Sequence, residues 1–266
     1  MNVATTRLTL VAVVMMGAVA LGCEEESTAK GAPAAASLEP AKPASVEAAK
    51  FVVDAPSSKV QFAMDAPLEK IYGRAPGAMT GELFVDLNDV TKSSGLVKVD
   101  LLELALYQQT REKEGEEFGK EIKDDTQNEH ARAWLEIGDD APKEKREQNR
   151  TVEFKINQIE TSGPKSFAAM KGDERTMRVK VTGDFRLHGH KTTKTADMDV
   201  TVKYEDGKPV SAHFKTVKPF AVGLEDHDVR PREAFGKLAK KTLEAVAPKV
   251  ASEANVELDF TAKPAS

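Results

Sequence analysis

Two of the five histidines in this chain of 266 residues, His188 and His190, are separated only by Gly189. Side chains two positions apart on a strand lie on the same face, and imidazole nitrogens are common ligands of zinc, copper and nickel. No third ligand or supporting carboxylate adjoins the pair, although His213 or another distant residue could be brought in by folding. A metal-dependent hydrolase is therefore one hypothesis for the function.

The strand that precedes this pair predicts where the histidines point. Phe185 and Leu187 occupy the apolar phase of an alternating run, so Arg186, His188 and His190 fall on the opposite phase. We expect these three side chains to be exposed on the outer face of a hairpin. Because a metal site normally needs three or four ligands with supporting hydrogen bonds, we expect no metal site here.

The densest polar cluster is the run EDHDVRPR at residues 225–232. An acidic loop of this kind could bind a cation, and its arginines could clamp the phosphate or quinone head group of a ligand. The same run could instead be a solvated lead-in to a helix, with a capping aspartate and a proline in the first turn. Candidates for a head-group contact are His227, Arg230 and Arg232.

Other catalytic patterns are absent from the sequence. It contains no G-x-S-x-G, H-E-x-x-H, P-loop or G-x-G-x-x-G motif, and its only cysteine is Cys23. The net charge of −5 and the lack of a basic patch interleaved with aromatic residues argue against nucleic-acid binding. We therefore expect a protein that is not an enzyme and that has no catalytic residue, cofactor or metal ion.

The N-terminal residues 1–22 have the composition of an export signal, with one arginine, no acid and a long apolar run. The stretch Val19-Ala20-Leu21-Gly22-Cys23 resembles the lipobox of bacterial lipoproteins, and this resemblance implies acylation of Cys23; a plain secretory signal is the alternative. Several acyl chains would give a durable anchor. We expect an exported lipoprotein on the periplasmic face of the outer or inner membrane, with the Ala/Pro-rich residues 23–50 as a disordered tether.

From residue 51 onward, apolar residues alternate with polar or small ones in short runs, which is typical of strands with one buried face. About eight such runs occur, and eight antiparallel strands suffice to close a barrel around one small ligand. The sequence thus predicts an all-β fold with an eight-stranded antiparallel barrel in residues 51–262 and one or two accessory helices. Its inward-facing residues would be Val60, Phe62, Met64, Leu83, Val85, Val99, Leu101, Phe154, Ile156, Phe185, Leu187, Met198, Phe214 and Phe260.

Two segments depart from the strand pattern. Residues 232–247 carry apolar side chains at spacings of three and four, which predicts an amphipathic helix on or in the barrel. Residues 108–150 form a charged insert, in which we expect a helix near Asn128–Ile137 that carries the only tryptophan, Trp134. The rest of the insert, Gly138–Arg150, is expected to be a flexible loop.

Several short stretches share their order with motifs of a known family. They are DAPSSKVQF at residues 54–62, GELFVD at 81–86, TGDFRLHGHKT at 182–192, FAVGL at 220–224 and the closing strand at 256–260. Together they resemble the YceI-like polyisoprenoid-binding proteins over residues 51–262. The resemblance implies an extended, lipocalin-like barrel whose hydrophobic interior holds a long isoprenoid or another lipid tail.

The apolar lining thereby becomes the candidate ligand cavity, and a long-chain isoprenoid or lipid becomes the expected partner. Apolar strand faces fill a core in most β proteins, so the lining residues alone do not distinguish a hollow barrel from a filled one. An envelope stress or interaction protein with a filled barrel is the alternative, in which the insert at residues 108–150 contacts a partner.

Overall fold

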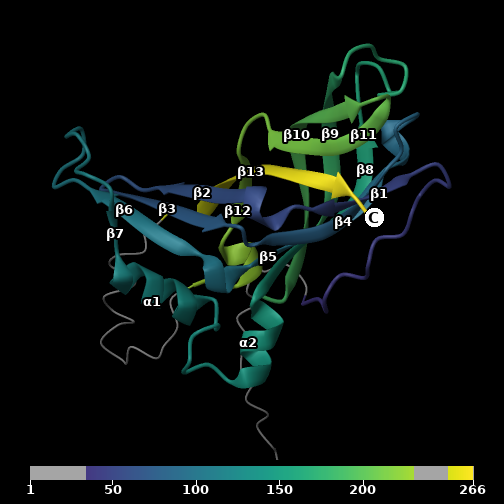
Figure 1. Ribbon diagram of the computed structural model, residues 1–266. Coiled ribbons are helices and arrows are strands. Elements are labelled where there is room, and N and C mark those ends of the chain that lie inside the picture. Colours follow the sequence, from purple (N-terminus) through teal and green to yellow (C-terminus); the bar gives the residue numbers. More distant parts are fainter. Residues whose placement is uncertain (1–33, 231–250, 266) are drawn as a thin grey trace, which may run out of the picture.

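The computed structural model describes residues 34–230 and 251–265, and most of this part is antiparallel sheet (Figure 1). The predicted helix at 232–247, Cys23 and the export signal lie outside the described residues. The strands are β1 (Ala49–Val53), β2 (Lys59–Asp65), β3 (Glu69–Pro76), β4 (Met79–Val85), β5 (Ser94–Asp100), β6 (Ala105–Thr110), β7 (Ile122–Lys123), β8 (Thr151–Glu160), β9 (Glu174–Leu187), β10 (His190–Glu205), β11 (Lys208–Thr216), β12 (Phe220–Gly223) and β13 (Glu253–Pro264). The helices are α1 (Asp125–Trp134) and α2 (Lys143–Asn149), and the 3₁₀ segments are η1 (Ala55–Ser57), η2 (Val90–Lys92), η3 (Leu101–Glu103) and η4 (Glu225–His227).

Eight strands close into a ring in the order β1-β4-β5-β8-β9-β10-β11-β13, and β13 pairs back to β1. Every neighbouring pair in this ring is antiparallel. The predicted all-β, lipocalin-like barrel with accessory helices is therefore confirmed.

The other strands extend the sheet beyond the ring. The extension begins where β13 changes its pairing partners along its length. The C-terminal half of β13 pairs with β1 and β11, and its N-terminal half pairs with β2 and β12. β3 continues into β4 through Gly77, whose φ of 70° lies in the left-handed region that glycine adopts without strain. The described residues thus form a sheet of 13 strands, where the sequence predicted about eight.

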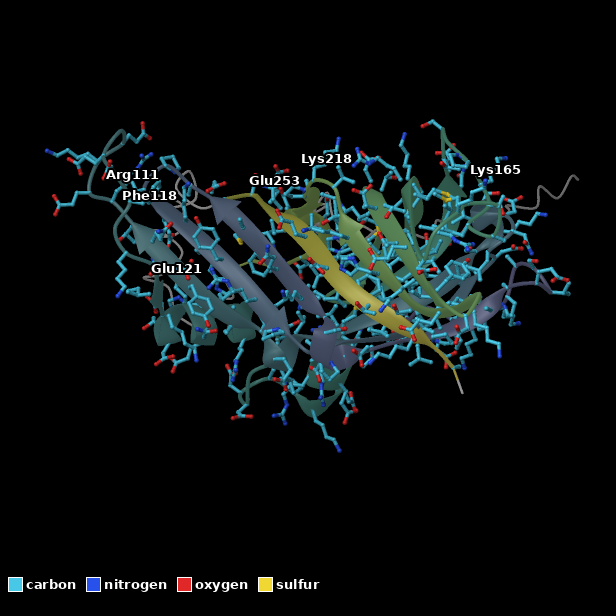
Figure 2. All side chains as sticks on the ribbon, turned by 45° about the horizontal axis from the view of Figure 1, so that its top comes forward. Arg111, Phe118, Glu121, Lys165, Lys218 and Glu253 are labelled. Carbon is cyan, nitrogen blue, oxygen red and sulfur yellow. The ribbon has the colours of Figure 1, made fainter. Side chains whose placement is uncertain are left out.

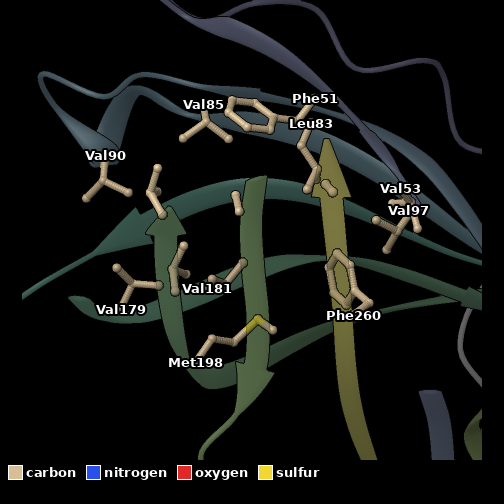
Figure 3. Close-up of a cluster of buried hydrophobic side chains, with 14 of the residues drawn as sticks. Phe51, Val53, Leu83, Val85, Val90, Val97, Val179, Val181, Met198 and Phe260 are labelled. Carbon is tan, nitrogen blue, oxygen red and sulfur yellow. The ribbon is translucent and has the colours of Figure 1, made fainter. Parts of the chain in front are cut away.

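The core lies inside the ring and follows from the alternation of the strands. Phe51, Leu83, Val179, Met198 and Phe260, which come from different strands, point toward one another (Figure 3). A second buried cluster lies where the end of α1 meets β9 and β12, and consists of Leu101, Leu135, Ile137, Phe185, Leu187 and Val222. The apolar phase of the strands is thus buried, as the sequence predicts.

The insert at residues 108–150 is more ordered than expected. Asp124 caps α1 by accepting a hydrogen bond from the backbone N–H of Gln127, and the Asn128 amide bonds both backbone groups of Leu106 on β6. The prediction that Gly138–Arg150 is a flexible loop is wrong, because these residues contain α2. Neither helix in the described part of the chain has the length and apolar character needed to cross a bilayer.

Figure 2 shows how the tip of this insert extends the molecule, with Arg111 and Phe118 at the end opposite Lys165. The guanidinium of Arg111 lies 4.4 Å from the centroid of the Phe118 ring, and the ammonium of Lys70 lies 4.9 Å from it. Cation–π contacts at such exposed sites contribute about 0.5–1 kcal/mol each. The tip is therefore held by surface contacts and not by the barrel core.

Residues 34–48 run along the outer wall of the barrel. The backbone N–H of Ala35 donates to the carbonyl of Gly189 at 2.7 Å, and that of Leu38 donates to the Glu153 carboxylate at 2.7 Å. The hydroxyl of Ser94 donates to the carbonyl of Lys42 at 2.6 Å. The disorder expected for residues 23–50 therefore does not hold for this part, because the barrel supplies hydrogen-bond partners that the composition of the segment does not reveal.

Candidate functional site

An apolar cavity with a volume of about 420 Å³ lies inside the barrel. Strands from both the ring and its extension contribute to its wall, and α1 covers part of it. Small-molecule sites typically have volumes of about 300–1,000 Å³ and are mostly apolar with a few polar groups. The interior therefore has the size and chemistry of a ligand site, which favours a hollow barrel over a filled one.

All residues predicted to face inward reach the cavity wall. Among them, Phe214 on β11 and Phe260 on β13 stack with their ring centroids 4.9 Å apart. Phe185 on β9 meets Phe220 on β12 edge to face, at 6.5 Å between centroids. The strand phase thus placed these side chains correctly, and their contact with a ligand stays a prediction.

Sequence reasoning missed the contribution of α1 to the wall. Gln127, His130, Ala131, Trp134 and Leu135 line the cavity from this helix and the residue that follows it. Their spacing of three and four residues is that of one helical face, so the signal was present in the sequence. Strand residues that were also missed include Ile71, Ala75, Met79, Val97, Leu106, Ile159, Val179, Val181, Val200, Phe220, Val222, Val256 and Leu258.

A polar group of the wall lies where β3, β6 and α1 meet. The carboxylate of Glu69 accepts hydrogen bonds from the side-chain amides of Gln108 and Gln127. Burial raises the pKa of Glu69 above its ordinary value; the hydrogen bond from Gln108 opposes this shift, and the negative charge of Asp124 adds to it. Together with His130, this group can hydrogen-bond a ligand's polar end, whereas most of the wall can only contact an apolar tail.

Arg186 is buried, so the prediction that it is exposed is wrong. Its guanidinium donates to the backbone carbonyls of Ala35, at 3.0 Å, and Gln148, at 3.1 Å. It also lies 3.8 Å from the buried carboxylate of Glu153, which the ammonium of Lys98 contacts at 2.8 Å. The strand phase was right, but residues 34–48 and α2 cover this part of the outer face.

His188 was also predicted to be exposed, and this is wrong as well, because the residue is only 5% exposed. With Gly189 it forms the two-residue turn between β9 and β10, with φ values of 50° and 74°. Positive φ at both positions is the geometry of a type I′ hairpin turn. The ring nitrogen Nδ1 lies 3.0 Å from the carbonyl oxygen of His227, and Nε2 lies 3.1 Å from Oε2 of Glu136.

Folding brings further polar side chains to this turn. His188, His190 and Asp228 have potential ligand atoms that all lie within 4.8 Å of one another. Asp228 also forms an ion pair with Arg230, whose Nε lies 2.7 Å from Oδ1, and Arg232 lies outside the described residues. The loop after η4 thus places a third potential ligand, which the sequence did not reveal, beside the two histidines.

His227, a predicted head-group contact, is fully buried and does not line the cavity. Its ring packs edge-on against Phe185, its Nδ1 lies 3.3 Å and 3.2 Å from the carbonyl oxygens of Leu187 and His190, and its Nε2 lies 3.2 Å from the hydroxyl of Thr192. Burial lowers the pKa of His227, so the neutral ring is favoured, with Nδ1 donating and Nε2 accepting. The residue holds η4 against the β9–β10 turn.

Comparisons with known proteins give structural similarities only. No family model matches the chain, and no curated protein matches it. It is similar to BcnA of Burkholderia cenocepacia, with a TM-score of 0.46 and 15% identity over 79% of this chain and 98% of that one. It is also similar to a domain from Saccharophagus degradans described as polyisoprenoid-binding and implicated in plant cell wall breakdown, with a TM-score of 0.49 and 14% identity over 82% of this chain and 99% of that one.

Proposed function

We propose that this protein binds the apolar tail of a long-chain lipid, of isoprenoid or similar type, inside its barrel. The observation that carries the proposal is the apolar cavity of about 420 Å³ in a closed antiparallel barrel. The isoprenoid class is suggested by the sequence resemblance to YceI-like proteins. The protein would act by sequestering or carrying its ligand, without chemical turnover.

The chemistry of the wall supports a tail in preference to a polar ligand. Each buried CH₂ contributes about 0.8 kcal/mol, so one prenyl unit of about five carbons contributes around 4 kcal/mol before the ordering of the tail is subtracted. A few units therefore suffice for tight binding. The length of the bound tail would then be set by the length of the cavity and not by the need for affinity.

The polar group around Glu69 gives the ligand an orientation within this proposal. A hydroxyl, amide or carbonyl at the end of the tail could exchange hydrogen bonds with Glu69, Gln127 or His130. We therefore favour lipids that carry a small polar head group.

We further propose that the barrel is exported and anchored to a bacterial membrane through an acylated Cys23, facing the periplasm. The lipobox-like sequence supports this, and an anchored carrier would remain next to a source of lipid. A Cys23→Ser variant should shift from the membrane fraction to the soluble fraction of the cell envelope. If the variant stays with the membrane as firmly as the original chain, the anchor is not at Cys23.

The lipid proposal is tested by extraction and by a variant that fills the cavity. The chain is purified from membranes, extracted with organic solvent and analysed by mass spectrometry, and the delipidated protein is titrated with geranylgeraniol and with palmitate. Ala131→Phe places a ring in the cavity and should abolish retention and binding. Ala133→Phe, on the same helix but not on the wall, is the matched control and should leave both unchanged.

Two results would refute the proposal. One is a correctly folded protein whose extract contains no lipid and which binds neither probe. The other is equal binding by the Ala131→Phe and Ala133→Phe variants, which would place any lipid outside the cavity.

A further inference from the structure

Three chain segments converge beside the β9–β10 turn, outside the apolar cavity. The turn contributes His188 and His190, the loop after η4 contributes Asp228, and the residue that follows Leu135 at the end of α1 is Glu136. The potential ligand atoms of the first three lie within 4.8 Å of one another, and Glu136 Oε2 is 3.1 Å from His188 Nε2. Two imidazoles and two carboxylates therefore meet from distant parts of the sequence.

The surroundings of His188 favour a cation at its Nε2. A neutral imidazole has one N–H donor and one acceptor, but both ring nitrogens of His188 face oxygen acceptors, those of His227 and Glu136. If Nδ1 donates to the His227 carbonyl, Nε2 presents a lone pair toward the Glu136 carboxylate. Either a second proton on the ring or a metal ion between Nε2 and the carboxylate would satisfy this pair; for a metal ion, the hydrogen bond at Nδ1 is the support that metal-bound histidines usually have.

The backbone around this cluster is unusual. In the described residues, four non-glycine residues have positive φ, and three of them are Glu136, His188 and Asp228, at 52°, 50° and 51°. The fourth, Asp206, lies in a separate hairpin turn with Gly207. A non-glycine residue in this region carries a conformational cost, and such residues concentrate at functional sites. The fold therefore holds three of the four side chains in place against their intrinsic preference.

We propose that His188, His190, Asp228 and Glu136 form a binding site for a divalent transition-metal ion of the zinc class. Imidazole and carboxylate are ligands that zinc accepts in a four-coordinate site, and the two carboxylates would balance the charge of the ion. Within the described residues, cationic side chains already contact both carboxylates, since Arg230 lies 2.7 Å from Asp228 and Lys145 lies 3.4 Å from Glu136. A bound ion would join α1 to the β9–β10 turn, so the site goes beyond the proposed binding of lipid.

The test measures the metal alone on the full chain, purified in detergent and stripped with a chelator. Zinc is titrated in competition with a chromogenic chelator, and cobalt(II) is used to read the coordination from its visible spectrum. We expect one equivalent of zinc and the intense cobalt absorption of a tetrahedral site. His190→Ala should weaken zinc binding by roughly tenfold or more, and His188→Asn, which tolerates the left-handed turn, should do the same.

The matched control is His213→Ala, because His213 also pairs with a carboxylate, that of Asp259 at 2.7 Å, but on β11 and away from the turn. It should bind zinc like the original chain. The proposal is overturned if the stripped protein takes up no zinc, or if His190→Ala and His213→Ala bind it equally. Because His190 is only partly buried, its variant remains informative even if His188→Asn does not fold.

Discussion

The cavity wall and the cluster around His188 are built in opposite ways. The wall consists of many similar apolar side chains on extended strands, so its character is shared among them and no single residue defines it. The cluster consists of a few polar side chains that come from separate loops and have strained backbone conformations. An apolar binding surface is thus spread over many residues and can tolerate the replacement of one apolar side chain by another. A polar site depends instead on the exact positions of a few atoms.

The largest effect on the wall should come from removing an aromatic side chain that also supports the cluster. Phe185 lines the cavity and packs against Phe220 and His227. Phe185→Ala should lower the free energy of unfolding by about 3–5 kcal/mol, measured by denaturant titration. Phe118→Ala, at the exposed tip, is the control; it removes two cation–π contacts and should cost about 1–2 kcal/mol. Similar losses for both would mean that the wall at Phe185 is not tightly packed.

A smaller effect should follow from adding one methyl group to the wall. Gly73 faces Phe62 across the β2–β3 pair, and a Cβ at Gly73 would come 2.1 Å from the Phe62 ring. Gly73→Ala should therefore displace the ring, cost about 1–3 kcal/mol and weaken binding of geranylgeraniol. Gly163→Ala, which has room for the methyl group, is the control. Unchanged lipid binding in Gly73→Ala would show that the cavity near Phe62 is not used.

On the polar side, a single hydrogen bond can be removed without touching the wall. The hydroxyl of Thr192 lies 3.2 Å from Nε2 of the buried His227. Thr192→Val should destabilise the protein by about 1 kcal/mol, because His227 loses a partner while the shape of the side chain is kept. Its exposed neighbour, in the variant Thr193→Val, should give no measurable change in a thermal unfolding experiment. A neutral Thr192→Val would mean that His227 does not depend on this bond.

The smallest effect concerns pH and Glu69, the acidic residue found on the wall among the described residues. Because burial raises its pKa, the folded state keeps a proton at pH values where the unfolded state has released it. The contribution of Glu69 to stability should be fully present below the ordinary pKa of a glutamate and should be lost as the pH rises through the raised value. Glu69→Gln should remove this loss, as followed by urea unfolding across the pH range. Glu82→Gln, on the exposed face of β4, should keep it, and a stability difference between Glu69→Gln and the original chain that does not change with pH would contradict the assignment.

The sequence predicted the fold and the inward face of the strands better than it predicted which residues of the outer face are exposed. Alternation with a period of two is a local property, so it gave the strand faces and the inward side of Phe185 and Leu187 directly. The alternation could not show which other segments of the chain pack against the outer face of the barrel. Arg186 has the outward phase that the sequence predicts, yet Ala35 and Gln148 bury it, and both belong to segments that the composition marked as a tether and a loop.

By itself, the sequence determined the barrel and its apolar lining, because burial of alternate side chains is decided within each strand. Only the tertiary structure decided that Glu136 and Asp228 meet His188 and His190, and that α1 covers the cavity. Those contacts join residues far apart in the chain, and they depend on where helices end and turns point. A periodic pattern records none of this, so the polar chemistry of this protein is a property of its fold.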